Sequence, residues 1–379
     1  MELKELRQEI DTLDAQLVEL FKKRMQVCGE IGRCKQEIGL PVLDSGRERD
    51  KLAQISALAG DDMGSYARAL WSTMFELSRA YQGAAAGQTS ALAQKVRAAI
   101  ENTPRLFPSC AAVACQGVEG SYSQQACEKL FAAPNILYFG NFDSVFSAIE
   151  SGLCQYGILP IENSTAGSVN KVYDLMMQHK FYIVRSMRLK VDHCLLANPG
   201  VQLKDLKEVY SHEQALSQCA GYLKSLGVKA IACENTAEAA RRVAESGRTD
   251  AAAIASRSCA AIYGLTALAD AIQDQDSNYT RFICISRRLE IYPGADRTSV
   301  MLVTAHKPGA LYKILSRCNA LGINLVKLES RPLPGRQFEF MFYFDLETSV
   351  YAEQFTQLLG ELEALCERFE YLGSYTEAV

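Results

Sequence analysis

The chain has 379 residues, which is too long for one ordinary hydrophobic core, so two or three domains are expected. Its hydrophobic content of 48%, charged content of 22% and net charge of −4 are typical of a soluble globular protein and argue against a general nucleic-acid binder. No apolar run approaches the roughly 18 residues that span a membrane, and the charged start, MELKELRQEI, lacks the apolar segment of a secretion signal.

Thirteen cysteines raise the question of a metal site or a disulfide framework. The count is odd, there is no C-x-x-C pair, and His179, His193, His212 and His306 complete no cluster with zinc-site spacing. Most cysteines lie in apolar runs such as CAAVAC and FICIS, where cysteine behaves as a small hydrophobic residue. We therefore expect structural cysteines, no metal and a reducing, cytoplasmic environment.

The first forty residues carry an unbroken spacing of three and four residues. The positions in this seam are Leu3, Leu6, Ile10, Leu13, Leu17, Leu20, Arg24, Val27, Ile31, Cys34 and Ile38. This pattern predicts one long helix with a coiled-coil-like seam that ends near Gly39 and Pro41. Since such a helix cannot bury its seam alone, we expect it to pack on two further helices, 45–59 and 64–82, and on a second copy of the chain.

Arg24 is the charged exception in this apolar seam, where an unpaired cation costs several kcal/mol. A salt bridge, or a polar residue that sets the helix register, would explain it as well as a ligand would. Lys35 favours a ligand, because it lies eleven residues further on, close to three helical turns, and so projects from nearly the same face. The turn 44-DSGRERD-50 then places Arg47 and Glu48 at the start of the second helix.

Three more polar residues belong to the same pattern. Ser78 and Gln82 stand four residues apart on the third helix and therefore point the same way. Arg7 lies beside the seam, about 42 Å from Lys35 along a straight helix. It cannot share a ligand with Lys35 unless it reaches into the site of a partner chain.

These residues resemble the all-helical chorismate mutases, whose pattern is an arginine early in a long helix, a second arginine, a lysine, a D-x-x-R-E turn and a late Ser-x-x-x-Gln. All eight positions are present, namely Arg7, Arg24, Lys35, Asp44, Arg47, Glu48, Ser78 and Gln82. The resemblance implies an internal rearrangement of the dicarboxylate chorismate, with Arg7 supplied by the other subunit. The arginines would hold the two carboxylates, and the site would need hydrogen-bond donors where charge develops.

Three of these residues carry the expected catalytic roles. Lys35 and Gln82 suit the ether oxygen, and Glu48, with Asp44, suits the ring hydroxyl.

Beyond this helical region, residues 83–109 shift to Ala, Gly, Ser and Pro, which is typical of a tether, here with a short helix and a boundary near Pro108.

From residue 111 onward, short apolar runs alternate with amphipathic segments. The predicted strands are 111–117, 136–140, 156–161, 193–198, 208–212, 229–233, 251–256 and 281–286, and the predicted helices are 123–131, 143–151, 213–226 and 236–247. This alternation implies parallel or mixed sheets with binding sites at the C-terminal ends of the strands.

Polar residues gather at those ends. They include the segments 119-EGSYSQQA-126, 162-ENSTAGSV-169 and 211-SHEQALSQC-219, Glu234 with Thr236, and 278-NYTRF-282. Any one of them is explained by a helix N-cap or a turn, but exposed N–H groups at helix starts also bind carboxylates. Thr280 and Arg281, at the entry of an apolar strand, suggest an anion site with a proton donor.

These segments, above all NYTRF, are similar to prephenate dehydratase, a two-lobed α/β fold that resembles periplasmic binding proteins. The resemblance makes Thr280 the expected catalytic residue. The expected prephenate-binding residues are Asn163, Ser164, Thr165, Ser211, Gln218, Glu234 and Arg281. The reaction expels the ring hydroxyl and CO₂ to give phenylpyruvate, so Thr280 would donate a hydrogen bond or relay a proton. For Arg281 the sequence leaves open whether it holds a carboxylate or braces the loop.

This sequence departs from the dehydratase pattern at two positions. The first loop, CQGVEGSYS, lacks the usual proline, and Glu213 stands where another proline is frequent. Neither position is one of the expected catalytic side chains.

Residues 297–376 read as strand, helix, strand, strand, helix, strand, which predicts a ferredoxin-like module for binding or dimerisation. The stretches 309-GALYKIL-315 and 329-ESRP-332 resemble the ACT domain of the same dehydratases, which binds phenylalanine between subunits. The implied effector-binding residues are Gly309, Ala310, Leu311, Asn324, Glu329, Ser330 and Arg331. A dimer interface without an effector is the alternative.

The predicted protein is a bifunctional enzyme that rearranges chorismate and then converts prephenate to phenylpyruvate under phenylalanine control. It combines a helical domain (1–85), a linker (86–109), a two-lobed α/β domain (110–287) and a ferredoxin-like ACT domain (296–376). We expect a cytoplasmic homodimer or higher homo-oligomer without metal or organic cofactor, and no nucleic-acid or membrane partner. The rivals are an arogenate dehydratase with an attached mutase and a non-catalytic amino-acid sensor, which would need neither the charged helix nor NYTRF.

Overall fold

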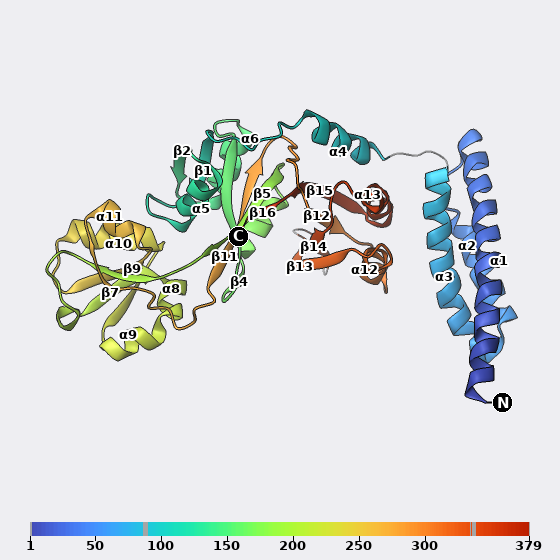
Figure 1. The fold of residues 1–379 in the computed structure, drawn as a ribbon, viewed down its shortest axis with the longest axis horizontal. Helices are drawn as coiled ribbons and strands as arrows, with labels where there is room; N and C mark the ends of the chain where they lie inside the picture. The colour runs from blue at the N-terminus through green and yellow to red at the C-terminus, as the bar shows by residue number, and fades with distance from the viewer. Residues whose placement is uncertain (1, 86–89, 334, 336–338, 379) are drawn as a thin grey trace. The chain divides into compact units, whose positions relative to one another are not determined.

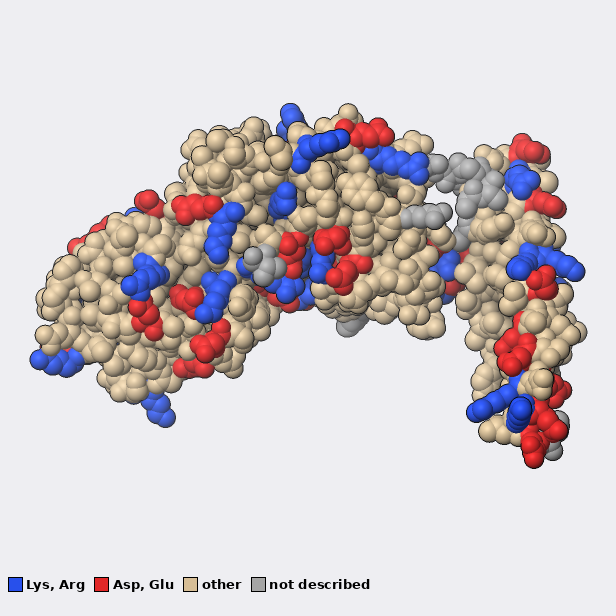
Figure 2. Space-filling model, in the orientation of Figure 1, with Lys and Arg blue, Asp and Glu red and all other residues tan. Residues whose placement is uncertain are grey.

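The computed structural model describes residues 2–85, 90–333, 335 and 339–378, and it divides into two compact units, Met1–Gln94 and Lys95–Val379 (Figure 1). Within the described ranges, no helix is both long enough and apolar enough to cross a membrane. On the face of the second unit shown in Figure 2, acidic and basic side chains are interspersed and form no continuous basic surface.

In the described residues up to Ala85, the first unit has three helices, as the sequence predicts. They are α1 (Leu3–Glu37), α2 (Ser45–Leu58) and α3 (Gly60–Ala85). Asp44 caps α2 by accepting a hydrogen bond from the backbone N–H of Arg47. Gly32 allows α1 to approach α3 closely, because a Cβ atom there would lie 2.7 Å from the backbone oxygen of Gln82.

Much of the predicted apolar seam of α1 is exposed in the single chain. Leu17 is 60% exposed and Leu20 is 62% exposed, whereas the buried positions of α1 are Cys28, Gly29 and Gly32. The part of the seam around these positions packs on α3, and the packing on a second chain, which the sequence also predicts, is not tested by a single chain. Exposed apolar surfaces of this kind commonly mark interaction sites.

The second unit begins in the predicted tether, whose short helix is α4 (Ala91–Asn102). Its first lobe is a mixed sheet with strand order β16-β5-β11-β3-β1-β2, in which β4 pairs with β3. The strands are β1 (Ala112–Gln116), β2 (Asn135–Phe139), β3 (Tyr156–Asn163), β4 (Gly167–Ser168), β5 (Tyr182–Lys190), β11 (Tyr279–Ser286) and β16 (Glu377–Ala378). Strand β5 was not predicted, because Arg185, Ser186 and Arg188 interrupt its apolar pattern.

The first-lobe sheet has a core on each face. Helix α5 (Tyr122–Leu130) covers one face. On the other face, α6 (Phe142–Glu150) and α7 (Asn170–Met176) share one continuous core with side chains of the C-terminal domain, among them Met301 and Tyr343. The C-terminal domain therefore packs against the back of this sheet.

The second lobe is a five-stranded sheet in the order β10-β6-β9-β7-β8. Its strands are β6 (Cys194–Ala197), β7 (Glu208–His212), β8 (Lys229–Cys233), β9 (Ala251–Ala255) and β10 (Thr266–Ala269), and its helices are η1 (Leu203–Asp205), α8 (Glu213–Gln218), α9 (Ala220–Leu226), α10 (Thr236–Ser246) and α11 (Ser258–Tyr263). The predicted helix 213–226 is broken at Cys219, which is fully buried. The chain crosses between lobes twice, after β5 and before β11, which confirms the two-lobed α/β prediction.

The C-terminal domain has the predicted βαββαβ order. Its elements are β12 (Arg297–Val303), α12 (Ala310–Ala320), β13 (Asn324–Pro332), β14 (Phe340–Glu347), α13 (Glu353–Leu365) and β15 (Arg368–Tyr375). The antiparallel strand order β13-β14-β12-β15 is ferredoxin-like.

Candidate active sites

Among the residues that the structure describes, two polar side chains between α1 and α3 are buried or partly buried without full pairing: Arg24 lacks a carboxylate partner, and one atom of Gln82 lacks a hydrogen bond. Arg24 donates a hydrogen bond to Ser78 Oγ, and its guanidinium lies 5.7 Å from the centre of the Phe75 ring. Among the described residues, no carboxylate forms an ion pair with Arg24, which argues against the salt-bridge explanation. One turn beyond Ser78, the buried Oε1 atom of Gln82 has no hydrogen-bond partner in the described part of the chain. Both features favour an anionic ligand that also forms hydrogen bonds.

The start of α2 adds more charges to this end of the helical unit. Lys35 Nζ donates to the carbonyl oxygen of Val42 over 2.6 Å, which ties α1 to the loop before α2. Glu48 accepts two contacts from Arg79 Nη1, at 2.5 and 2.6 Å. Arg79 was not predicted, because it adjoins Ser78 but belongs to no recognised pattern. Arg47 is exposed, so its guanidinium is accessible.

Arg7 is not brought to this group within one chain. It is exposed near the start of α1, about 42 Å from Lys35 along the helix. Only a second chain could bring its guanidinium to these residues.

In the second unit, the side-chain amide of Asn163 has a defined orientation. The backbone N–H groups of Thr165 and Ala166 donate to Asn163 Oδ1 over 3.1 and 2.9 Å. Because backbone N–H groups can only donate, the other edge of the amide must carry Nδ2. Asn163 lies opposite Thr280 in the register of β3 and β11, and its Nδ2 donates to Thr280 Oγ1 over 3.0 Å.

This arrangement leaves the hydroxyl proton of Thr280 available. Its Oγ1 accepts from Asn163, and among the described residues no acceptor for its own O–H is found. A hydroxyl that accepts an amide hydrogen bond becomes a better donor, because the amide stabilises charge that develops on the oxygen. Thr280 is thus prepared to donate to an oxygen atom of a ligand.

Gln218 links the second lobe to this pair. Its Nε2 donates to Thr165 Oγ1 over 2.6 Å and to Asn163 Oδ1 over 3.3 Å. Its Oε1 accepts from Asn278 Nδ2 over 3.1 Å and lies 3.0 Å from His193 Nε2. The two lobes therefore meet through hydrogen bonds at the predicted site.

Three residues of this network were not predicted. Asn278 is buried, and its Oδ1 accepts from Asn163 Nδ2 over 2.8 Å. His193 is also buried, and Tyr122 Oη lies 3.3 Å from its Nδ1. Asn278 could have been found, since it opens the NYTRF segment, whereas His193 was considered only as a metal ligand. Among the described residues, no group of three or more His, Cys, Asp or Glu could hold a metal ion.

Other predicted prephenate-binding residues are placed differently. Ser164 Oγ donates to the carbonyl oxygen of Ser277 over 2.7 Å and so holds the loop before β11. Ser211 is fully buried and donates to the carbonyl oxygen of Ile254, which argues against direct contact with a substrate. Glu234 is exposed and forms no hydrogen bond with Asn163 or Thr280.

Comparisons with known proteins identify the family of the chain. Sequence profiles of two families match the chain: "Chorismate mutase type II" over residues 6–83 and "Prephenate dehydratase" over residues 113–290. The bifunctional chorismate mutase/prephenate dehydratase of Escherichia coli (strain K12) is 31% identical over 382 residues, covering 98% of this chain and 95% of that protein. The chain belongs to this bifunctional family. It is therefore both a chorismate mutase and a prephenate dehydratase of phenylalanine biosynthesis.

Two further relatives match about 70% of the chain. Arogenate dehydratase 2 of Petunia hybrida is 41% identical over 280 residues, covering 69% of this chain and 71% of that protein. A solved structure of prephenate dehydratase from Arthrobacter aurescens in complex with L-Phe is 28% identical, with a TM-score of 0.65, and covers 70% of this chain and 90% of that chain.

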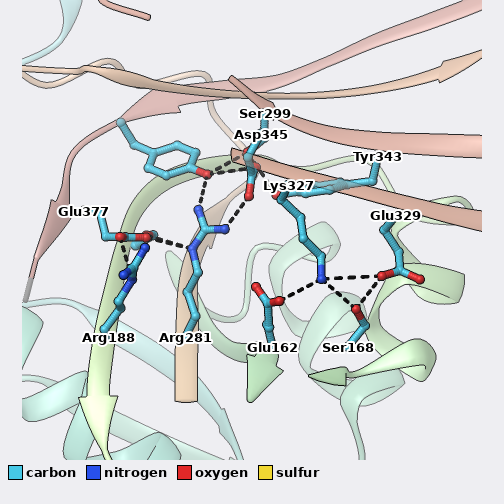
Figure 3. A network of polar contacts seen from close by, with 12 residues as sticks. Glu162, Ser168, Arg188, Arg281, Ser299, Lys327, Glu329, Tyr343, Asp345 and Glu377 are labelled. Atoms are coloured by element: carbon cyan, nitrogen blue, oxygen red, sulfur yellow. Dashed lines mark hydrogen bonds and ion pairs between the residues drawn. The ribbon is translucent and has the colours of Figure 1, made fainter. Parts of the chain in front are cut away.

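In the dehydratase, Arg281 does not face the same side as Thr280. It is 8% exposed, and its guanidinium is bound by Asp345, by Tyr375 Oη at 3.0 Å and by Glu377 at 2.8 Å (Figure 3). Neighbouring residues of a strand point to opposite faces of the sheet. The predicted prephenate contact of Arg281 is therefore contradicted by its position, and the bracing role is favoured.

The predicted effector residues divide between the two faces of the C-terminal domain. Gly309, with φ of 79°, precedes α12, and Ala310 and Leu311 form its first turn. Asn324 and Ser330 are exposed on β13. By contrast, Glu329 contacts Ser168 and Arg331 pairs with Asp174, both in the first lobe. This corrects the prediction for Glu329 and Arg331, because alternation along β13 turns both away from Ser330.

His193 predicts a pH dependence of dehydratase stability. Burial lowers the pKa of His193 below its ordinary value of 6.5, against smaller opposing effects of Gln218 and Asp192. The unfolded chain thus takes up this proton at a higher pH than the folded chain does. The free energy of unfolding should be fully retained above pH of about 6.5 and should decrease as pH falls from there toward the folded-state pKa.

This expectation is checked by the urea concentration that halves dehydratase activity, measured at pH 7.5 and 5.5. His193→Gln keeps a hydrogen-bonding side chain but cannot take up a proton in this range, so it should reduce the difference between the two midpoints. An unchanged difference would mean that other groups cause the acid sensitivity.

Proposed function

We propose that residues 1–85 carry the mutase site, residues 110–287 carry the dehydratase site, and residues 296–376 form an ACT domain that binds phenylalanine. Residues 86–109 connect the two catalytic domains. The observation that carries the dehydratase assignment is the Asn163–Thr280 hydrogen bond, which prepares a threonine hydroxyl as a donor where the two lobes meet.

In the mutase site, chorismate rearranges without a covalent bond to the protein. Arg24, Arg47 and Arg7 of the partner subunit bind the two carboxylates, and Ser78 holds Arg24 in place. The ammonium group of Lys35 and the side-chain amide N–H of Gln82 stabilise the charge that develops on the ether oxygen as the C–O bond breaks.

Two acidic residues complete the mutase site. Glu48, which pairs with Arg79, accepts a hydrogen bond from the ring hydroxyl. Asp44 supports it by capping α2, since this fixes the first turn that carries Glu48.

In the dehydratase site, the bond between the ring carbon and its carboxylate breaks and CO₂ leaves. The electron pair of that bond makes the ring aromatic and expels the ring hydroxyl on the opposite carbon, which leaves as water after it gains a proton. Thr280 donates a hydrogen bond to the departing oxygen or passes a proton to it, and Asn163 stabilises the charge on Thr280 Oγ1. Thr165 and Gln218 orient Asn163, while Ser164 holds the loop.

Phenylalanine binds the exposed side of the C-terminal domain, at Gly309, Ala310, Leu311, Asn324 and Ser330. The likeness to the Arthrobacter aurescens structure in complex with L-Phe supports this assignment. The exposed apolar stripe of α1 supports a homodimer, which would also deliver Arg7. All thirteen cysteines are free thiols, which supports a reducing, cytoplasmic location.

The substrate of the second site has one specific competitor. The plant relative at 41% identity is named an arogenate dehydratase, and arogenate differs from prephenate in carrying an amino group in place of the keto group. We propose prephenate, because the same chain makes it.

The test is to supply the purified chain with chorismate, prephenate or arogenate and to measure phenylpyruvate or phenylalanine, with and without added phenylalanine. Phenylpyruvate should form from chorismate and from prephenate, and phenylalanine should change the second rate. A strong preference for arogenate in kcat/KM would contradict the substrate assignment.

A further inference from the structure

The two catalytic segments of the dehydratase have a second, buried side that the reaction does not use. On β3 and β11, Asn163 pairs with Thr280 in the sheet register, and the next residues inward, Glu162 and Arg281, pair with each other. Because successive side chains alternate across a sheet, Glu162 and Arg281 both point to the face opposite the Asn163–Thr280 pair. That face is covered by the C-terminal domain.

The guanidinium of Arg281 is bound by residues of the C-terminal domain and by a residue of the first-lobe sheet. The C-terminal domain supplies Asp345, which is fully buried on β14, and Tyr375 on β15. Ser299 donates to Asp345, so this carboxylate is fixed as well. The other carboxylate, Glu377, lies on β16, which joins the first-lobe sheet beside β5.

Glu162, which pairs with Arg281 in the sheet register, also forms an ion pair with the C-terminal domain. Lys327 on β13 reaches Glu162 at 2.7 Å and Ser168 at 2.9 Å, and Glu329 contacts the same serine (Figure 3). Each strand that carries a proposed catalytic residue is therefore joined by an ion pair to a strand of the C-terminal domain. Such buried or partly buried pairs tolerate little change in geometry.

Strand β13 connects these contacts to the opposite side of the C-terminal domain. Lys327, Glu329 and Arg331 face the first lobe, whereas Asn324 and Ser330, which we propose to bind phenylalanine, are exposed on the same strand. A change in the position of β13 or β14 must move β3 and β11 or break the ion pairs. Either change acts directly on the two strands that carry Asn163 and Thr280.

We propose that Arg281 and Glu162 are positioning residues through which the C-terminal domain sets the geometry of the Asn163–Thr280 pair. This rests on the proposed binding of phenylalanine. The Arg281–Asp345 and Glu162–Lys327 ion pairs carry the effect of phenylalanine to the dehydratase site. They are not needed for the chemistry itself, because Arg281 keeps Glu377 as a partner when Asp345 loses its charge.

The experiment uses the full chain with Asp345→Asn and, as a second variant, Lys327→Met. For each, the dissociation constant of phenylalanine is measured by calorimetry and dehydratase kcat and KM are measured with and without phenylalanine. Allosteric effects of this kind typically change a constant by about 5- to 150-fold. In both variants the change caused by phenylalanine should shrink to about twofold or less, while the phenylalanine dissociation constant stays within about threefold of wild type.

Arg368→Leu is the matched control. Arg368 also pairs with a carboxylate within the C-terminal domain, Glu370 on β15, but among the described residues its side chain forms no ion pair or hydrogen bond with β3 or β11. It should keep the full response to phenylalanine. If Arg368→Leu loses the response as well, or if both test variants respond as wild type does, the proposal is overturned.

The remaining outcomes also decide. If the wild-type chain does not bind phenylalanine, the proposed effector function fails, and this inference fails with it. If the wild-type chain binds phenylalanine and its dehydratase kinetics change, but the kinetics of the two variants change by the same factor, only the inference fails. Asp345→Asn replaces a fully buried carboxylate, and loss of phenylalanine binding would show that this variant does not fold. In that case Lys327→Met alone gives the result, because Lys327 is partly exposed and its replacement disturbs the fold less.

Discussion

Replacing Thr280 with alanine should lower phenylpyruvate formation by at least about 100-fold and leave the conversion of chorismate to prephenate unchanged. The hydroxyl is the one polar group of this side chain, and the proposed mechanism uses its proton on the departing oxygen. Both rates come from one preparation, by following chorismate loss and phenylpyruvate appearance. The mutase rate then serves as an internal measure of intact protein.

Thr280→Ser is the matched variant, because serine keeps the hydroxyl opposite Asn163. It should retain a substantial part of the dehydratase rate, whereas Thr280→Val, which has nearly the shape of threonine, should behave like alanine. Full dehydratase activity in Thr280→Val would remove Thr280 from the mechanism. Asn163 would then need another role than supporting its hydroxyl.

Arg24→Ala and Arg7→Ala should each lower the mutase rate by about 100- to 1,000-fold, because each removes a cation that holds a carboxylate of chorismate. Neither should change the dehydratase rate with added prephenate. Measuring both rates separates loss of a site from loss of the protein.

Mixing the two variants distinguishes a shared site from two separate ones. If Arg7 acts in the partner's site, a dimer of one Arg7→Ala chain and one Arg24→Ala chain contains one intact site and one doubly defective site. Random pairing of equal amounts then restores about a quarter of the wild-type rate. Co-expressed chains that remain inactive, although they form dimers by analytical ultracentrifugation, would place Arg7 and Arg24 in the same chain's site.

The sequence predicted much of the first unit because its signals are local. Helical spacing alone places Arg24 and Lys35 on one face of α1, and Ser78 and Gln82 on one face of α3. For the apolar seam, spacing shows that residues share a face but does not show what covers that face. The seam residue Leu17 is exposed in the single chain.

In the second unit the strand-end segments were visible in the sequence, and the structure brings Asn163, Gln218 and Thr280 together from three separate places in the chain. Their mutual orientation was not visible. The direction of the Asn163 amide follows from two backbone N–H groups in the turn after β3. His193 and Tyr122 join the network only because the two lobes meet there.

By itself, the sequence determined the order of the three folded regions and the residue types of both sites, because periodicity and short motifs record local backbone structure. Only the tertiary structure decided that Thr280 and Arg281, neighbours in one motif, belong to different environments. The alternation of a β-strand turns one toward the meeting point of the lobes and the other toward the C-terminal domain. Which sheet covers which face depends on contacts between distant segments, and no local spacing encodes it.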